Sequence, residues 1–541
     1  MIKEFFQKRY VLWHGFILTL IYFPLLSAYF VQDEWQLFSS YYSASASTFL
    51  EKISFFIIPQ PGQYVPITSL FAFIMFSVFH LEYLAYFYIS MILFLLNAYF
   101  LSKVCLILTK NRLAAIIAAS FFIIAPLHFQ ATSWAVASFG YHLSALFAMA
   151  SLIHLLKWID EGKGSRLYIS GALLLLSLLS KGTSMFLVVF YPLLVFLQTK
   201  SLKRTFHSLA SLVPSVFFII WNYWFIRTHP LADFTVIKQE TSLFNLFSLP
   251  LRTLLQSILP QDILLNLSRF ISGIILQSND VFRVGSFAET KGMGIIFGFG
   301  LLILLIALFF LVFYKHKGCK PWLITLCFIG LSGLPFYFVT YNKFSLIPPR
   351  YLYFGVIGVG IGVSYLSAYI IRSKKRNYFV ALITLLFTYG VITFNQSIDL
   401  GKTGSVRKSI LAQISKNDLK EDQNVIFIES DSSFYGLSEK VRTLPFQNGF
   451  GKTLATFLHG RIYIPDEVYK NPDILWPIES QGYFGDASRG FGYFRDYTKL
   501  VEVLEEKGLP LSAVTAFTFK EGVLVNTTTQ IRSKLKNSLP K

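Results

Sequence analysis

Apolar runs of about 20 residues recur along roughly the first 400 positions of the chain, separated by short polar segments, and each run is long enough to cross a hydrocarbon core about 30 Å thick as a helix. The first run contains "VLWHGFILTLIYFPLLSAYF". It is too long for a removable signal peptide and lacks a small-residue cleavage site, so we interpret it as a retained helix. The pattern predicts a polytopic α-helical membrane protein.

The composition supports this prediction and changes how the charge is interpreted. Only 14% of the residues are charged and 54% are hydrophobic, whereas a soluble protein carries about 25% charged residues. The net charge of +19 lies largely in short clusters between apolar runs, where it indicates membrane orientation rather than nucleic-acid binding. The three cysteines, Cys105, Cys319 and Cys327, fall in no predicted outer segment, so no disulfide framework is expected.

Short basic loops mark the cytoplasmic side of a membrane protein. Here they are "KRY" at the start, "KVCLILTKNR", "KWIDEGKGSR", "KSLKR", "KHKGCK" and "RSKKR". Placing all of these loops inside requires an even number of membrane crossings between any two consecutive loops. We therefore interpret the apolar segment 66–80 as a helix lying in or dipping into the outer interface, with a crossing helix as the alternative. The segment 240–278, broken by two prolines and an arginine, is interpreted as outer interfacial helices.

The resulting prediction is about 11 spans, with the N-terminus inside and the C-terminus outside. Several are short, which tilt or local thinning of the bilayer accommodates. The predicted spans are 11–30, 84–102, 113–127, 133–156, 167–180, 185–199, 208–226, 293–314, 321–341, 351–371 and 378–395.

The composition changes at about residue 397. "NVIFIES" and "GVLVNTT" are typical of strands, and "YTKLVEVLEEKG" is typical of a helix closed by glycine. We predict a transmembrane domain over 1–396, with a first outer loop at 31–83 and an outer interfacial segment at 228–292. A small extracytoplasmic α/β domain is predicted over 397–541.

The predicted short outer loops hold few cations: Lys181, Lys343 and Arg350. The positive-inside rule places most Lys and Arg on the cytoplasmic side, so cations on the outer side run against it. Ionisable groups at the membrane boundary are often functional. A lipid phosphate is a natural partner, because arginine presents a fork that matches phosphate and lysine a compact charge. The alternative is that each side chain snorkels to lipid headgroups.

Two adjacent acids, Asp33 and Glu34, follow directly after the first span. A carboxylate there can deprotonate a hydroxyl while nearby cations stabilise a departing phosphate. The alternative is a solvated loop start without a role. Histidines His80, His128 and His142 lie on the same predicted side and lack the spacing of a zinc site. The chain has neither a Walker lysine loop nor a dinucleotide glycine fingerprint.

Several short motifs occur in a recognisable order. The acidic pair lies in "QDEW", and the first outer loop continues with "YVPITSLFAF" from Tyr64. A helix with Asn97 near its middle follows, in "FLLNAYFL".

The order continues with "PLH", which ends at His128, and with Trp134 just after it. A serine–lysine pair, Ser180 and Lys181, ends a helix, and "RYLY" from Arg350 enters a late one. Over about residues 10–371 the chain resembles the GT-C glycosyltransferases that use polyprenyl-phosphate sugars. The resemblance is nearest to the protein O-mannosyltransferase branch and its bacterial relatives.

The chain also departs from that pattern. Gln130 stands where the relatives often have glutamate, Phe139 where they often have arginine, and Gly182 where they have a carboxylate. These departures weaken any claim of a second catalytic acid or a bound metal. No metal site and no cofactor are predicted, and a divalent cation is left open.

The resemblance implies roles for the motif residues. Asp33 would be the general base and Glu34 would orient the loop or the acceptor. Lys181 and Arg350, with Lys343 as a third candidate, would hold the lipid phosphate. Candidates for contacting substrate, listed without individual roles, are Trp35, Tyr64, His128, Trp134, His142, Tyr351 and Tyr353. Interface anchoring is the alternative for the aromatic residues.

The predicted function is therefore an integral membrane glycosyltransferase. It would move a sugar, mannose or another hexose, from a polyprenyl-phosphate donor to a hydroxyl of a glycan, lipid or protein acceptor, with inversion. The expected location is the cell inner (plasma) membrane, multi-pass, with no nucleic-acid partner. A lipid or polysaccharide flippase is the alternative from another class, and a polysaccharide polymerase or ligase of another fold keeps the sugar chemistry.

Overall fold

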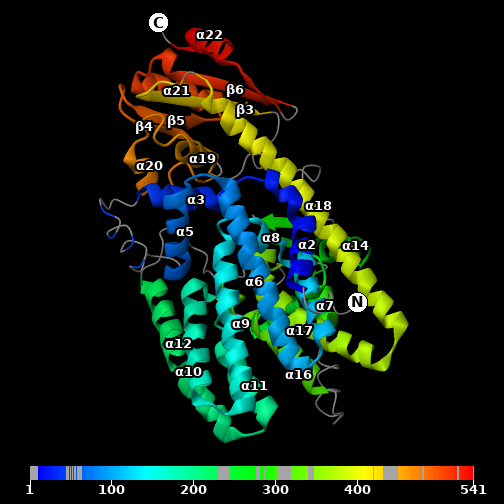
Figure 1. Cartoon of the computed structure of the whole chain (residues 1–541). Helices are drawn as coiled ribbons and strands as arrows, with labels where there is room; N and C mark the ends of the chain where they lie inside the picture. The colour runs from blue at the N-terminus through cyan, green and yellow to red at the C-terminus, as the bar shows by residue number, and fades with distance from the viewer. Residues whose placement is uncertain are drawn as a thin grey trace. The chain divides into compact units, whose positions relative to one another are not determined.

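The computed structural model describes residues 10–43, 48, 50, 53, 57, 64–228, 243–275, 281–284, 287–290, 293–300, 319–338, 346–417, 419–430, 449–471, 473–477, 480–520 and 523–539. The chain divides into two compact units (Figure 1). Unit 1 consists of Met1–Phe23, Phe56–Ala72 and Phe87–Gln396. Unit 2 consists of Pro24–Phe55, Phe73–Tyr86 and Ser397–Lys541, so it combines the C-terminal segment with parts of the predicted first outer loop.

Helices dominate the first 415 residues; the short 3₁₀ helices are labelled η. In chain order the elements are α2 (Tyr10–Tyr22), η1 (Phe23–Ser27), α3 (Gln32–Ser43), α5 (Pro66–Phe79), α6 (Tyr83–Thr109), α7 (Arg112–Ile124), η2 (Pro126–His128), α8 (Phe129–Ser133), α9 (Ser138–Glu161), α10 (Gly164–Ser180), η3 (Gly182–Ser184), α11 (Leu187–Thr199), α12 (Leu202–Thr228), α13 (Leu243–Ile258), α14 (Gln261–Ile275), β1 (Val281–Val284), β2 (Phe287–Thr290), α16 (Cys319–Leu331), η5 (Leu334–Phe338), η6 (Pro349–Leu352), α17 (Tyr353–Ser373) and α18 (Arg376–Ser415).

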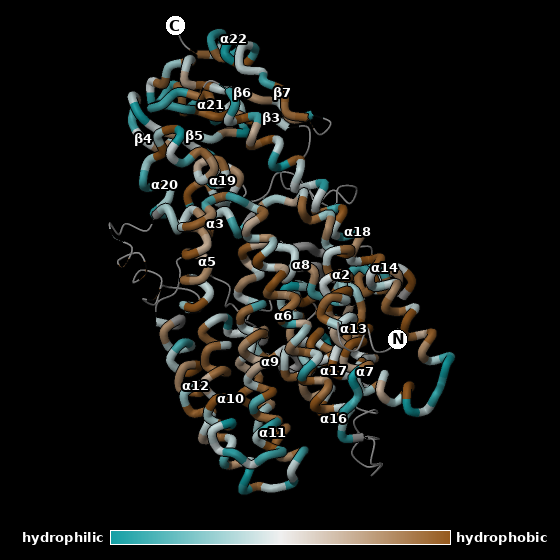
Figure 2. The backbone as a smooth tube through the Cα atoms, viewed as in Figure 1, coloured by the Kyte–Doolittle hydropathy of each residue, from teal (hydrophilic) through white to brown (hydrophobic). Residues whose placement is uncertain are grey.

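Among the described residues, seven helices are long and apolar enough to cross a membrane, or eight if the bent pair α7 and η2–α8 is one span. Figure 2 shows that hydrophobic residues predominate along these helices. On α12, Val213, Phe217 and Ile220 are each more than 60% exposed. Water would penalise such a surface and hydrocarbon does not. The prediction of a multi-pass helical membrane protein with a small C-terminal α/β domain is confirmed.

Serine pairs join α9 to α10 inside unit 1. The hydroxyl of Ser151 donates to the Ser170 carbonyl at 2.6 Å, and the Ser170 hydroxyl donates to the Ser151 carbonyl at 2.9 Å. Two helical turns further along α10, the Ser177 hydroxyl donates to the Ser144 carbonyl at 2.7 Å. Small residues allow helices to approach closely, and packing and hydrogen bonds replace the hydrophobic effect, which does not drive helix association in lipid. These pairs therefore fix the register of the two helices.

Glycines allow the same close approach elsewhere in unit 1. A Cβ on Gly171 of α10 would collide with the backbone carbonyl of Ser211 on α12. On α17, Gly358 and Gly362 lie four residues apart, and a Cβ on either would press into α16, against Phe328 and Thr325 respectively. In both places a small residue at the interface lets two membrane helices approach closely.

Helix α7 ends at a bend of 47° before η2. Pro126 has no N–H and Ala125 is extended, so the helix cannot continue. The carbonyls freed at its end receive side-chain donors from other helices: Tyr22 of α2 donates to Ile123 at 3.1 Å, and Thr393 of α18 donates to Ile124 at 2.6 Å. The predicted span 113–127 is therefore a helix followed by a bent turn.

Unit 2 contains a five-stranded sheet in the order β4-β5-β3-β6-β7. The central strand β3 pairs in parallel with β5 and β6, and the edge strands β4 and β7 are antiparallel to their neighbours. The elements are β3 (Gln423–Ser430), α19 (Phe450–Phe457), α20 (Asp466–Lys470), β4 (Gly482–Gly485), β5 (Gly490–Phe494), α21 (Tyr497–Lys507), η7 (Leu511–Ala513), β6 (Val514–Lys520), β7 (Val523–Asn526) and α22 (Thr528–Ser538).

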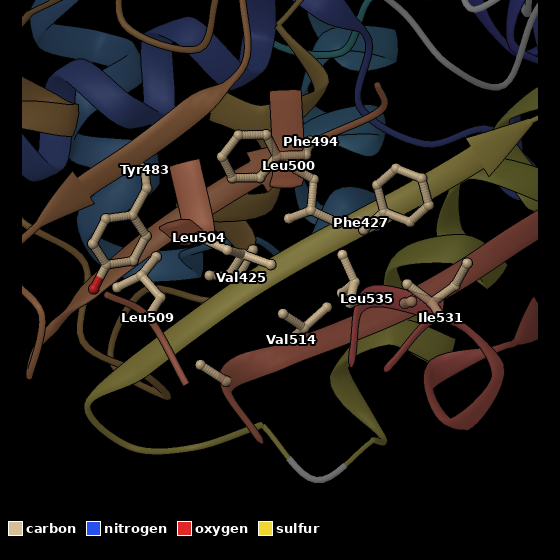
Figure 3. Close-up of a cluster of buried hydrophobic side chains, with 12 residues drawn as sticks. Val425, Phe427, Tyr483, Phe494, Leu500, Leu504, Leu509, Val514, Ile531 and Leu535 are labelled. Atoms are coloured by element: carbon tan, nitrogen blue, oxygen red, sulfur yellow. The ribbon is translucent and has the colours of Figure 1, made fainter. Parts of the chain in front are cut away.

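One face of this sheet is covered by α21 and α22. Val425 and Phe427 of β3 pack there against Leu500 and Leu504 of α21 and Leu535 of α22 (Figure 3). The alternate positions of β3 are buried too, which is expected of a central strand covered on both faces. The predicted strand at 424–430, a strand within the predicted segment 522–528 (β7) and the helix closed by Gly508 are confirmed.

Several boundaries differ from the predicted spans. Helix α18 does not end at 395 but continues to Ser415, because Gly401 and Gly404 allow it to lie directly against the backbone of Pro24, Ala28 and Tyr29 within unit 2. The segment 240–278 forms α13 and α14, with Pro250 inside α13. The segment 66–80 is the 14-residue helix α5, which is shorter than a typical span. Residues 301–314 of one predicted span lie outside the described residues.

Lys452 of α19 is a buried lysine in unit 2. Its ammonium donates to the carbonyls of Val468 and Asn471, each at 2.6 Å. Burial lowers the pKa of Lys452 to about 8, and the Asp473 carboxylate offsets part of this shift. The charged form is therefore less favourable in the folded domain than in water.

We predict that Gly171→Ala lowers the free energy of unfolding by about 1–3 kcal/mol, because the added methyl group overpacks the α10–α12 contact. The measurement is the thermal unfolding midpoint of the purified protein in detergent. Gly164→Ala is the matched control on the same helix, since nothing lies within 4 Å of its Cβ position. Equal midpoints for the two variants would contradict the close contact.

We predict that Lys452 makes unit 2 more stable as the pH rises from about 8 towards 10.5, its unperturbed value. In that window the unfolded chain binds the proton that the folded domain has lost, so the free energy of unfolding increases with pH. Hydrogen exchange of the α19 amides in the full chain measures this increase. Lys452→Met should abolish the slope, and Lys470→Met, at an exposed site, should leave it unchanged.

Candidate functional site

The acidic pair lies in the first turn of α3 in unit 2. Glu34 is completely buried, and its carboxylate accepts the Val31 N–H at 2.7 Å while its own N–H donates to the Val31 carbonyl at 2.9 Å. Asp33 is only partly buried. Both carboxylates lie at the positive end of a helix, which favours their charged forms. The two neighbours are therefore placed differently: Glu34 supports the turn, and Asp33 is accessible.

Arg407 of α18 is a buried cation beside this turn. Its side chain interacts electrostatically with the Glu34 carboxylate, and none of its three guanidinium nitrogens has a hydrogen-bond partner among the described residues. Arg407 is not among the site residues predicted from the sequence. Its signal was present, because Arg407 interrupts an apolar stripe with Ile410, Leu411 and Ile414 at helical spacing. A buried arginine so placed fixes a carboxylate by charge.

Lys181 follows α10 in unit 1, and its ammonium lies 4.7 Å from the ring centroid of Tyr141 on α9. Gly140 gives the lysine stem room, since a Cβ there would lie 3.3 Å from its Cδ. Thr68 of α5 donates to the Ser180 carbonyl at 2.7 Å, next to the lysine. The local fold thus directs the cation over an aromatic face, where cation–π attraction stabilises it.

Arg350 lies in η6, directly after the pair Pro348–Pro349. Its guanidinium lies 5.3 Å from the Trp134 ring centroid and 5.1 Å from that of Tyr351. The prolines restrict the backbone before the turn, and η6 packs against η2 and α8. Arg350 and Trp134, which are far apart in the sequence, are therefore brought together.

A buried polar network lies beneath these cations. The Tyr353 hydroxyl accepts from Asn97 Nδ2 at 3.1 Å and lies 2.8 Å from His142 Nδ1. Phe122 stacks on His128, and His128 lies edge-on to Tyr353. Tyr353 also lies 6.2 Å from Tyr141, ring to ring. Tyr141, the ring that carries Lys181, thus contacts Tyr353 of this network, and Arg350 lies three residues before Tyr353 in η6, which leads into α17.

The other candidate residues are placed as follows. Trp35 is buried and donates to the Phe30 carbonyl at 3.3 Å, so it packs in unit 2 rather than facing an open surface. Tyr64 donates to the Ile57 carbonyl at 2.8 Å and contacts Trp221 edge-on. His128 and His142 are completely buried. Lys343 lies outside the described residues. Within the described part of the chain, no three His, Cys, Asp or Glu side chains are grouped to hold a metal ion.

No protein-family model and no curated protein matches the chain. Among solved structures, it is similar to an oligosaccharyltransferase from Archaeoglobus fulgidus that is tethered with an acceptor peptide. The identity is 12% and the TM-score 0.38, over 79% of this chain and 62% of that one. This chain therefore spans less than two thirds of the length of that protein.

The chain is also similar to ArnT from Cupriavidus metallidurans bound to undecaprenyl phosphate. The identity is 12% and the TM-score 0.43, over 98% of this chain and 95% of that one. Both TM-scores lie below 0.5, so neither similarity by itself assigns an activity to the chain.

We predict that Tyr353→Phe destabilises unit 1 by about 1–3 kcal/mol, because Asn97 and His142 each lose a buried partner. Thermal unfolding in detergent measures the loss. Tyr369→Phe on the same helix is the matched control, since that residue is 57% exposed. A Tyr353→Phe variant as stable as the control would show that the hydroxyl network contributes nothing.

Proposed function

We propose that the protein is a membrane glycosyltransferase of the GT-C type, which transfers a sugar from a polyprenyl-phosphate donor to an acceptor hydroxyl. The observation that carries the proposal is the pair of cations in unit 1. Lys181 and Arg350 are both held on aromatic faces: Lys181 lies over Tyr141, which contacts Tyr353, and Arg350 lies over Trp134 in the turn before α17. Two fixed cations at helix ends suit a phosphate carried by a lipid, and the aromatic faces suit a sugar.

The proposed chemistry begins at Asp33. Its carboxylate removes the proton from the acceptor hydroxyl while that oxygen attacks the anomeric carbon of the donor. A new carbon–oxygen bond forms as the bond from the anomeric carbon to the phosphate oxygen breaks. The electron pair leaves with the polyprenyl phosphate, and attack from the opposite side inverts the anomeric centre.

The remaining residues assist this step. Lys181 and Arg350 stabilise the charge that the phosphate gains on leaving, with Lys343 as a third candidate. Glu34 does not touch substrate in this proposal. It holds the turn that presents Asp33, through its bond to Val31 and its interaction with Arg407. Asp33 is therefore proposed as the catalytic residue and Glu34 as a positioning residue.

The proposed setting is the inner (plasma) membrane, with the N-terminus in the cytoplasm and the C-terminal domain outside. This orientation follows from the basic loops between the apolar runs. The sugar is proposed to be a hexose, with mannose as the first to test, and the acceptor to be a glycan, lipid or protein.

The test uses purified protein in nanodiscs with a panel of radiolabelled polyprenyl-phosphate hexoses. We expect wild type to release polyprenyl phosphate, and Asp33→Asn to lose at least about 100-fold in turnover while still binding donor, because a general base is removed. Asp160→Asn, at an exposed position, is the matched control.

Two further variants separate binding from chemistry. Lys181→Gln and Arg350→Gln should each weaken donor binding, measured with undecaprenyl phosphate as the probe. Turnover retained by Asp33→Asn would exclude the base role. Donor binding without turnover, together with lipid movement between leaflets, would favour a flippase instead.

A further inference from the structure

A small cavity of about 200 Å³ opens between α2, α6 and α7 in unit 1. Its polar lining comes from Tyr10, Ser102, Lys103 and Arg112, and its apolar lining includes Leu106 and Ile116. The described lining contains two cations and no acidic residue. The cavity therefore combines positive charge with an apolar wall, and the proposed function uses none of these residues.

Aromatic rings hold both cations in place. Tyr10 and Tyr99 stack with ring centroids 6.2 Å apart and planes 7° from parallel. The Lys103 ammonium lies 5.1 Å from the Tyr99 ring, and the Arg112 guanidinium lies 5.5 Å from the Tyr10 ring. Cation–π contacts of this kind reduce the freedom of long side chains and leave their charge available to an anion.

The cavity lies at the opposite end of the helices from the Lys181–Arg350 site. Tyr353 begins α17 and packs beside His128, just after α7 ends. At the other end of the same helix pair, Arg372 donates to the Thr109 carbonyl at 3.0 Å, close to where α7 begins at Arg112. The run of thirteen residues in α7 separates the two ends by about 18 Å.

The surroundings indicate a ligand that reaches the cavity from lipid. Leu12 and Phe16 on α2 are 65% and 59% exposed, and Leu113 beside Arg112 is 39% exposed. These exposed apolar side chains belong to two of the helices that line the cavity, α2 and α7. Lys110, Lys374 and Arg376 add charge at this end of the helices. Basic pockets between transmembrane helices at the membrane boundary suit the headgroups of anionic lipids.

We propose that this cavity binds the phosphate of an anionic phospholipid in the leaflet at the basic end of the helices. Lys103 and Arg112 contact the phosphate oxygens from two helices. The Tyr10 and Ser102 hydroxyls lie beside them, and Leu106 and Ile116 receive the apolar part of the lipid. Bound lipid would stabilise the packing of α2, α6 and α7 by mass action.

The test measures binding of fluorescent phosphatidylglycerol and fluorescent phosphatidylcholine to the full-length protein in detergent. We expect phosphatidylglycerol to bind more tightly. Lys103→Gln/Arg112→Gln should weaken it by about 30-fold, since each cation near an anionic headgroup contributes several-fold in affinity. Lys163→Gln/Lys203→Gln is the matched control, because it removes the same charge from exposed positions that do not line the cavity.

Conservative variants keep the test informative if the double variant folds poorly. Lys103→Arg/Arg112→Lys retains both charges and should retain phosphatidylglycerol binding. Equal affinity of wild type for the two lipids, or an equal loss in the control variant, would overturn the proposal. Displacement of the lipid by inorganic phosphate would identify a site for a soluble anion instead of a lipid.

Discussion

The close approach of helices through small residues is the constraint on which unit 1 depends. Lipid removes the hydrophobic drive between helices, so packing and hydrogen bonds must hold them. The serine pairs of α9 and α10 and the glycines of α17 supply both. Because α9 and α17 are fixed in this way, Tyr141 and Tyr353 meet at one end of unit 1, with Lys181 over the Tyr141 ring and Arg350 in the turn before α17. The polar chemistry at this end of unit 1 is therefore a consequence of packing deeper in the unit.

Unit 2 depends on a comparable approach of backbone to backbone. Gly401 and Gly404 let α18 lie against Pro24–Tyr29, and one turn later Arg407 meets Glu34. Removing either partner of such a buried pair leaves an uncompensated charge. The segment that carries Asp33 is thus held by a helix nearly four hundred residues further along the chain, which makes the acidic pair a feature of tertiary structure and not of a local loop.

The sequence predicts the class of fold well, because hydropathy and basic loops report directly on lipid and water. It predicts ends of elements less well. The extension of α18 arises from a glycine contact that no local pattern contains, and the bend after α7 is visible only as Pro126. At the site, Lys181 and Arg350 could be predicted from the sequence, because the positive-inside rule does not expect cations in short outer loops. The burial of His128, His142 and Trp35 could not be predicted, since a polar or aromatic residue at a helix end has the same local pattern whether it faces solvent or the interior.

The bend after α7 also bears on how the protein is assembled during synthesis. The Ile123 carbonyl is satisfied by Tyr22, which is made earlier, but the Ile124 carbonyl receives its donor from Thr393, 269 residues later. An unpaired carbonyl in hydrocarbon is costly. The broken helix is therefore incomplete throughout the insertion of the intervening helices and is completed only when the last apolar helix joins the bundle. A chain that ends before α18 lacks the Thr393 donor, so its Ile124 carbonyl would have to find another partner within the membrane.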